Sequence, residues 1–345
     1  LEAQEVTPII VAAPTVDWLP ETCAVIRDQD DPDTPFHFGR RLAELITRYE
    51  LSPTMYFGGG SAPLLDSGMA HTIAAMLHRS EFRPPGSRIP SHIALTDNLH
   101  SSDWVALSNV ADALPIIQNA DRDNSLAWLL RESGEFEVRV IAAMRPAASL
   151  DIDTPADLAI MALHPDLQPN LARVVGDERL RAIPVREVIN VAATPESNLT
   201  LIGRVSPLAW QVLNNATQCW VRVYAEERGM VASGRQARHE VRSLLGEMIQ
   251  LQGPRAFFDT LAGMTEAAII DSRPLMAAQG RWPSAADRFA SDLYLVDQIS
   301  DPWLRDFTAA AAGAAIPVLL GGHSVVAGGL YALAEIIGGQ KRRSR

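Results

Sequence analysis

The nine residues Leu150-Asp151-Ile152-Asp153-Thr154-Pro155-Ala156-Asp157-Leu158 have the pattern of a strand that passes into a helix. The apolar run from Glu137 to Met144, which precedes them, is typical of a mostly buried strand. Thr154 is a suitable N-cap, Pro155 fits the first helical position, and the Asp157 carboxylate would meet the positive end of the helix dipole. The pattern therefore predicts that a helix begins directly after Thr154.

Two carboxylates, those of Asp151 and Asp153, lie together at this junction. Their repulsion is costly unless a cation, a base or hydrogen bonds offset it. Carboxylate oxygens presented in this way commonly bind Mg²⁺. The junction is therefore a candidate Mg²⁺ site, and the alternative is a capping turn with one solvated aspartate.

The string Leu-Asp-Ile-Asp-Thr-Pro-x-Asp-Leu at residues 150–158 resembles the closing motif of nucleotidyltransferases of the MobA/CofC/sugar-nucleotide type. In that family an aspartate before the Thr-Pro pair helps to hold the catalytic Mg²⁺. The matching position here is Asp153, with Asp151 beside it. The resemblance implies transfer of a nucleotide from an NTP to a phosphorylated or cofactor-type acceptor, with Mg²⁺ polarising the α-phosphate.

The order of elements upstream is also similar to that family. Predicted strands alternate with predicted helices at residues 38–49 and 66–78, and the apolar runs lie at residues 6–14, 23–26, 54–57 and 93–95. This alternation predicts a mostly parallel, Rossmann-like sheet with right-handed crossovers. We therefore expect a nucleotidyltransferase-like α/β domain over residues 1–163.

Two departures from the family pattern bear on activity. The family's first strand and its glycine-rich, arginine-bearing loop, which grips the triphosphate, should lie before Leu1. The family's Asp-x-Pro metal motif is replaced by Ser61-Ala62-Pro63, and a serine hydroxyl is a poor Mg²⁺ ligand. Both departures favour the alternative function, a non-catalytic nucleotide-binding, metabolite-binding or regulatory protein on a degenerate nucleotidyltransferase scaffold.

Two loops that follow predicted strands supply the other candidate site residues. Gly58, Gly59, Gly60 and Ser61 form a glycine loop that would let a substrate approach the backbone. The alternative is a tight turn without a ligand.

The polar segment from Thr96 to Trp104 follows the next predicted strand, where open α/β sheets carry their ligand loops. Asp97 is a candidate catalytic residue alongside Asp153, and Asn98 and His100 are candidate substrate contacts. A run of Asx turns is the alternative. We expect Asp153, Asp97 and the Gly58–Ser61 loop to converge on one cleft.

The segment from His164 to Asn170 reads as a linker, and the chain beyond it is richer in Ala, Leu, Arg and Glu. We expect a largely α-helical second domain over residues 170–340. Its charged residues would form buried ion pairs or, alternatively, a phosphate pocket. These residues are Arg222, Glu226, Glu227, Arg228, Asp271, Arg273, Asp287, Arg288 and Asp292. His323 would be a core histidine or would face such a pocket.

Composition limits the remaining function classes. A chain of 345 residues should contain about two domains, and a net charge of −11 argues against a nucleic-acid surface. Its two cysteines lack metal-site spacing and suggest a reducing, cytoplasmic setting. Residues 307–334 contain no Asp, Glu, Lys or Arg, but their small residues and Pro317 predict a buried helical pair instead of a membrane span. Homo-oligomer formation stays open.

Overall fold

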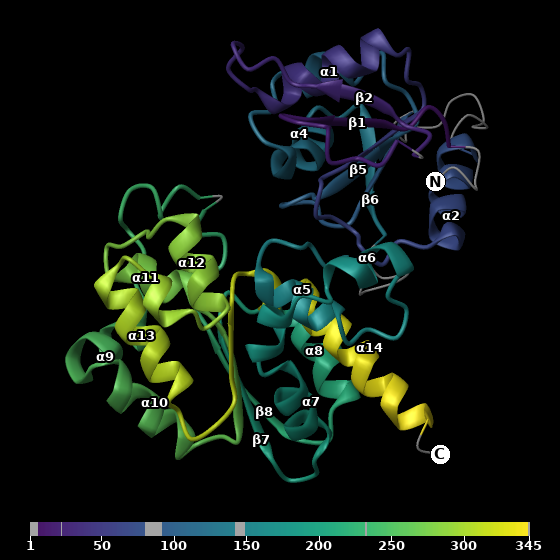
Figure 1. The fold of residues 1–345 in the computed structure, drawn as a ribbon. Coiled ribbons are helices and arrows are strands. Elements are labelled where there is room, and N and C mark those ends of the chain that lie inside the picture. Colours follow the sequence, from purple (N-terminus) through teal and green to yellow (C-terminus); the bar gives the residue numbers. More distant parts are fainter. Residues whose placement is uncertain (1–5, 22, 80–91, 142–148, 232, 344–345) are drawn as a thin grey trace. The chain divides into compact units, whose positions relative to one another are not determined.

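The computed structural model describes residues 6–21, 23–79, 92–141, 149–231 and 233–343. The chain divides into two compact units, unit 1 (residues 1–148) and unit 2 (residues 149–345) (Figure 1). The division falls before Leu150 and not within the predicted linker at residues 164–170. The motif at residues 150–158 therefore belongs to unit 2, not to the predicted N-terminal domain.

Unit 1 is a mixed α/β unit. Its strands are β1 (Ile10–Ala13), β2 (Ile26–Gln29), β3 (Thr54–Phe57), β4 (His92–Thr96), β5 (Trp104–Leu107) and β6 (Phe136–Val140). Its helices are α1 (Phe38–Arg48), α2 (Ser67–Arg79), α3 (Leu114–Gln118) and α4 (Leu126–Glu132). β1 and β2 form a parallel pair, and the other strands form a sheet in the order β3-β5-β4-β6. β5 runs antiparallel to both of its neighbours, so this sheet is mixed and not mostly parallel as predicted.

Helices cover both faces of the β3-β5-β4-β6 sheet. Ala94 and Val105 pack with residues of α1, α3 and α4, whereas their neighbours Leu95 and Trp104 pack with residues of α2. Successive strand residues point to opposite faces, so a sheet covered on both faces requires continuous apolar strands. This explains why β4 and β5 are almost uniformly buried.

The buried carboxylate of Asp28 attaches β2 to α1. It accepts hydrogen bonds from Arg41 Nη2 at 2.7 Å, Arg48 Nη1 at 2.6 Å and Tyr49 Oη at 2.7 Å. Burial alone would raise the pKa of Asp28, but these hydrogen bonds lower the pKa to about 2. The side chain is therefore an ionised anchor for the polar side of α1.

Unit 2 contains a four-stranded parallel sheet. Its strands are β7 (Asn198–Gly203), β8 (Trp220–Ala225), β9 (Ala267–Asp271) and β10 (Val318–Gly321). They pair in the order β10-β9-β7-β8, and every pair is parallel. The α/β class is thus confirmed, but the expectation of a largely helical domain over residues 170–340 is wrong. The apolar runs that form these strands are short, and the spacing of apolar residues in such short runs does not distinguish a strand from a helix.

The helices of unit 2 lie on both faces of this sheet. They are α5 (Pro155–Met161), α6 (Pro169–Val174), α7 (Val185–Ala193), α8 (Pro207–Ala216), α9 (Leu244–Gln252), α10 (Pro254–Ala262), α11 (Arg273–Ala278), α12 (Ala285–Asp292), α13 (Pro302–Ala312) and α14 (Gly328–Arg343). Figure 1 shows α9, α10 and α13 on one side of the strands and α7, α8 and α14 on the other. Phe257, Phe258 and Phe307 fill the core on the first side, packed with Ile202 and Ile270 of the sheet.

The uncharged segment at residues 307–334 does not form the predicted helical pair. It contains the end of α13, the buried strand β10, a short turn at residues 324–326 and the start of α14. Within the part of the chain that the structure describes, no helix has both the length and the apolar character that crossing a membrane requires.

Candidate functional site

The strand order of unit 2 creates a switch point. From β7 the chain first crosses to β8 on one side, and it then returns past β7 to β9 on the other side. In open parallel sheets with this order, a crevice forms at the carboxyl ends of the two strands where the direction changes, and ligands bind there. In unit 2 these strands are β7 and β9. Arg204 follows β7, and Asp271 is the last residue of β9.

An ion pair joins these two strand ends. Arg204 Nε lies 2.6 Å from Asp271 Oδ2, and Arg204 Nη2 lies 3.1 Å from Asp271 Oδ1. Burial alone would raise the pKa of Asp271, but Arg204, His323 and Arg273 lower it. Gly203 has a φ of +111°, and a Cβ there would lie 2.6 Å from Asp271 Cβ. Only glycine allows the end of β7 to come this close to β9.

His323 is at the same edge of the sheet, immediately beyond β10. Its side chain is partly accessible to solvent. Desolvation by the surrounding protein lowers the pKa of His323, and the positive charge of Arg204 lowers it further. Asp271 and Asp153 oppose this shift, and Arg228 adds to it. The imidazole is therefore neutral at pH 7, so one ring nitrogen can donate a hydrogen bond and the other can accept one.

Asp153 reaches this cluster from the start of α5. The predicted helix start is confirmed, because Thr154 is the N-cap and Pro155 is the first helical residue. Asp153 is exposed and close enough to His323 to influence its charge. Of the predicted site residues, Asp153 is thus the one that lies among the charged groups of the unit 2 edge.

The Asp157 side chain stabilises the turn at the start of α5 through hydrogen bonds. Its carboxylate is fully buried, and its Oδ2 accepts hydrogen bonds from the Asp153 and Thr154 backbone N–H groups at 3.1 and 2.8 Å. Its Oδ1 accepts a hydrogen bond from Ser324 Oγ at 2.6 Å. Burial raises the pKa of Asp157 to about 7, although the hydroxyls of Ser324 and Thr154 oppose the rise.

Most of the other charged residues of unit 2 have structural roles. Arg273 binds Asp292 through two hydrogen bonds of 2.9 and 2.6 Å, and this pairing raises the pKa of Arg273 despite its burial. Asp287 accepts hydrogen bonds from the backbone N–H groups of residues 300 and 301 at 2.9 and 3.1 Å. The prediction of buried ion pairs is therefore confirmed for Arg273 and Asp292. Arg228, in contrast, is exposed, and no ion pair joins it to a carboxylate among the described residues.

The candidate loops of unit 1 meet at one edge of its sheet. Gly58 N–H donates to the Asp103 carbonyl at 3.0 Å, which brings the Gly58–Ser61 loop against the loop that begins at Asp97. The buried Asp97 carboxylate accepts backbone N–H groups of Asp103 and Trp104 at 3.1 and 3.4 Å, and burial raises its pKa. Asp97 therefore braces the hairpin between β4 and β5.

Other polar side chains in these loops also form contacts close to their own positions in the chain. Asn98 Oδ1 accepts the His100 backbone N–H at 3.0 Å, and the His100 ring lies 4.9 Å from that of Trp128. Ser61 Oγ donates to the Gly58 carbonyl at 2.9 Å. These contacts match the turn-forming alternative for both loops. Because Asp153 belongs to unit 2, its predicted convergence with Asp97 stays a prediction.

The predicted Mg²⁺ site at Asp151 and Asp153 stays a prediction. In the described part of the chain, no group of three or more His, Cys, Asp or Glu side chains is placed to hold a metal ion. Asp151 is half-buried and has an interaction partner. Mg²⁺ is usually held by one or two carboxylates together with substrate phosphates, so a larger group of protein ligands is not required for the predicted site.

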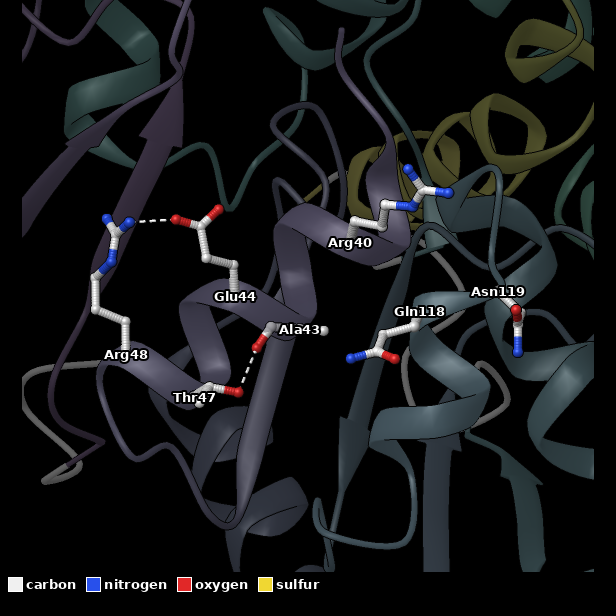
Figure 2. Close-up of a pocket in the computed structure, with 7 residues that line it drawn as sticks. All are labelled: Arg40, Ala43, Glu44, Thr47, Arg48, Gln118 and Asn119. Atoms are coloured by element: carbon white, nitrogen blue, oxygen red, sulfur yellow. Dashed lines mark hydrogen bonds and ion pairs between the residues drawn. The ribbon is translucent and has the colours of Figure 1, made fainter. Parts of the chain in front are cut away.

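A hollow of about 730 Å³ lies on the surface of unit 1 (Figure 2). It is lined by Arg40, Ala43, Glu44, Thr47, Arg48, Gln118 and Asn119. Arg48 and Glu44 pair with each other, and Thr47 Oγ1 donates to the Ala43 carbonyl at 2.8 Å. These groups on α1 therefore satisfy one another, while Gln118 and Asn119 line the hollow from the end of α3.

Arg204 was not among the residues that the sequence singled out. The available signal was the order of residue types around it. The apolar run Leu199–Gly203 precedes Arg204, and Ser206 and Pro207 after it are a typical N-cap and first helical residue. This order marks a strand that passes into a helix, where α/β sheets place ligand contacts.

The buried Asp157 carboxylate should make the stability of the protein depend on pH. Its pKa is about 7 in the folded protein and 3.8 in the reference state, so the folded state holds the proton between these values. The free energy of unfolding should therefore fall, by a few kcal/mol, as the pH rises from about 4 to about 7. In Asp157→Asn the amide can accept the two backbone N–H groups and donate to Ser324, so this fall should largely disappear.

Urea unfolding between pH 4.5 and 7.5 measures this dependence. The exposed neighbour variant Asp153→Asn is the control and should keep most of the wild-type slope. Equal slopes for the wild-type protein and Asp157→Asn would show that Asp157 does not hold the proton.

A comparison of the chain with known protein families, with curated proteins and with solved structures finds no match.

Proposed function

We propose that unit 2 binds a small anionic metabolite, of the phosphorylated or nucleotide kind, at the carboxyl edge of β7, β9 and β10. The proposal rests on one observation: the Arg204–Asp271 ion pair joins the strand ends at the switch point, and His323 is close enough to influence the charge of Asp271. Parallel sheets of this order bind their ligands at this position.

The chemistry of the edge suits an oxyanion. Arg204 uses Nε and Nη2 for Asp271, and its planar guanidinium carries a further Nη1 donor. Arg228 supplies an exposed second guanidinium, and the neutral His323 supplies one hydrogen-bond donor. Charge-assisted hydrogen bonds from such groups are the usual means by which proteins hold phosphate.

This proposal corresponds to the binding-protein alternative from the sequence. Nucleotidyl transfer from an NTP to a small acceptor is the second candidate, and it is favoured by one observation, the position of Asp153 beside His323.

Calorimetric titration of the full chain with orthophosphate, pyrophosphate and nucleotides tests the binding proposal. Arg228→Ala should weaken binding of the anion about tenfold, because a charge-assisted hydrogen bond contributes roughly 1.5 kcal/mol. Arg228 is exposed, so the variant should keep the wild-type unfolding temperature. Arg181→Ala removes an exposed arginine from another part of unit 2 and should bind normally. If no anion binds, or both variants bind alike, the proposed site is wrong.

The second candidate is tested by NTP titration and pyrophosphate release, with and without Mg²⁺. If Asp153 serves nucleotidyl transfer, Asp153→Asn should abolish the Mg²⁺ dependence of NTP binding. Because the side chain is exposed, folding should be unchanged. NTP binding that is the same with and without Mg²⁺ in the wild-type protein would leave only the binding function.

A further inference from the structure

The hydrogen bond between Asp157 and Ser324 joins segments 167 residues apart in the chain. The capping box of α5 requires only Oδ2 of Asp157, which accepts the Thr154 N–H at 2.8 Å. Oδ1 is therefore left for another partner, and Ser324 Oγ occupies it at 2.6 Å. Both side chains are buried, so the bond is shielded from competing water.

The two glycines before His323 bring the same segments into close contact. A Cβ at Gly321 would lie 3.2 Å from Ala156 Cβ, and one at Gly322 would lie 3.1 Å from Thr154 Cγ2. The loop after β10 thus packs tightly against the first turn of α5. Gly322 is held on one side of His323 by packing, and Ser324 is held on the other side by the Asp157 hydrogen bond.

We propose that Asp157 is the positioning residue of the unit 2 site, and that it acts through Ser324 to fix His323 beside Arg204 and Asp271. This inference rests on the proposed function of that site. Asp157 also accepts the backbone N–H of Asp153 at 3.1 Å. One buried carboxylate therefore orients both the turn that carries Asp153 and the loop that carries His323.

Ser324→Ala separates positioning from simple stabilisation, because it removes the Oδ1 hydrogen bond and leaves the capping box of α5 intact. The matched control is Ser291→Ala. Ser291 is also a buried serine of unit 2, and its Oγ lies 2.7 Å from Thr308 Oγ1. Both variants remove one buried hydroxyl hydrogen bond, so both should lower the unfolding temperature by a similar amount.

The distinguishing measurement is the NMR titration of the His323 ring, assigned with His323→Asn. In Ser324→Ala the loop should loosen, and the pKa of His323 should rise, because the imidazole loses part of its contact with the surrounding protein. Orthophosphate affinity, measured by calorimetry, should fall about fivefold. Ser291→Ala should leave both quantities at their wild-type values, and Ser324→Thr, which keeps a hydroxyl, should restore them.

The possible outcomes separate this inference from the proposed function. If Ser324→Ala changes the His323 titration and the affinity no more than Ser291→Ala does, Asp157 has only a structural role and the inference is overturned. If the His323 titration shifts as expected while the wild-type protein binds no orthophosphate, the positioning role is supported and the proposed function fails.

Discussion

The ion pair between Arg204 and Asp271 is the interaction on which the unit 2 edge depends. It joins the ends of the two strands at the switch point, and it places a buried carboxylate where burial alone would favour the neutral form. Removing either partner would leave an uncompensated charge in the protein interior, which typically costs about 3–5 kcal/mol. Gly203 makes this pair possible, because its positive φ and its missing Cβ let the end of β7 come close to Asp271.

The other features of the edge are arranged around this pair. His323 follows β10, and Asp153 precedes α5. Hydrogen bonds of the Asp157 side chain connect the two segments that carry these residues. Arg273 and Asp292 form a second buried ion pair, and the Arg273 backbone N–H donates a hydrogen bond to Asp271 of the first pair. The edge therefore combines buried, paired charges with His323, Arg228 and Asp153, which are exposed at its surface. Small-molecule sites likewise present a few precisely placed polar groups that are held by buried neighbours.

Sequence reasoning succeeded where the determinants are local. Thr154, Pro155 and Asp157 act within one helical turn, and the helix begins where they predict. Two strands of unit 2 were missed because β10 has only four residues and β9 only five, within alanine-rich segments that suggest helix. The order of the strands, which brings Arg204, Asp271 and His323 together, depends on long-range pairing that no local pattern encodes. For the loops at Gly58 and Asp97, the sequence could not distinguish a turn from a ligand site, because the same residue types form both.

The most direct test of the central claim is a crystal structure of the full chain grown with tungstate, a phosphate analogue that scatters anomalously. The account predicts an anomalous peak at the carboxyl edge of β7 and β9, within hydrogen-bonding distance of Arg204, Arg228 or His323. A tungstate ion bound only in unit 1, or no ion at the unit 2 edge at a concentration that saturates binding in solution, would contradict it.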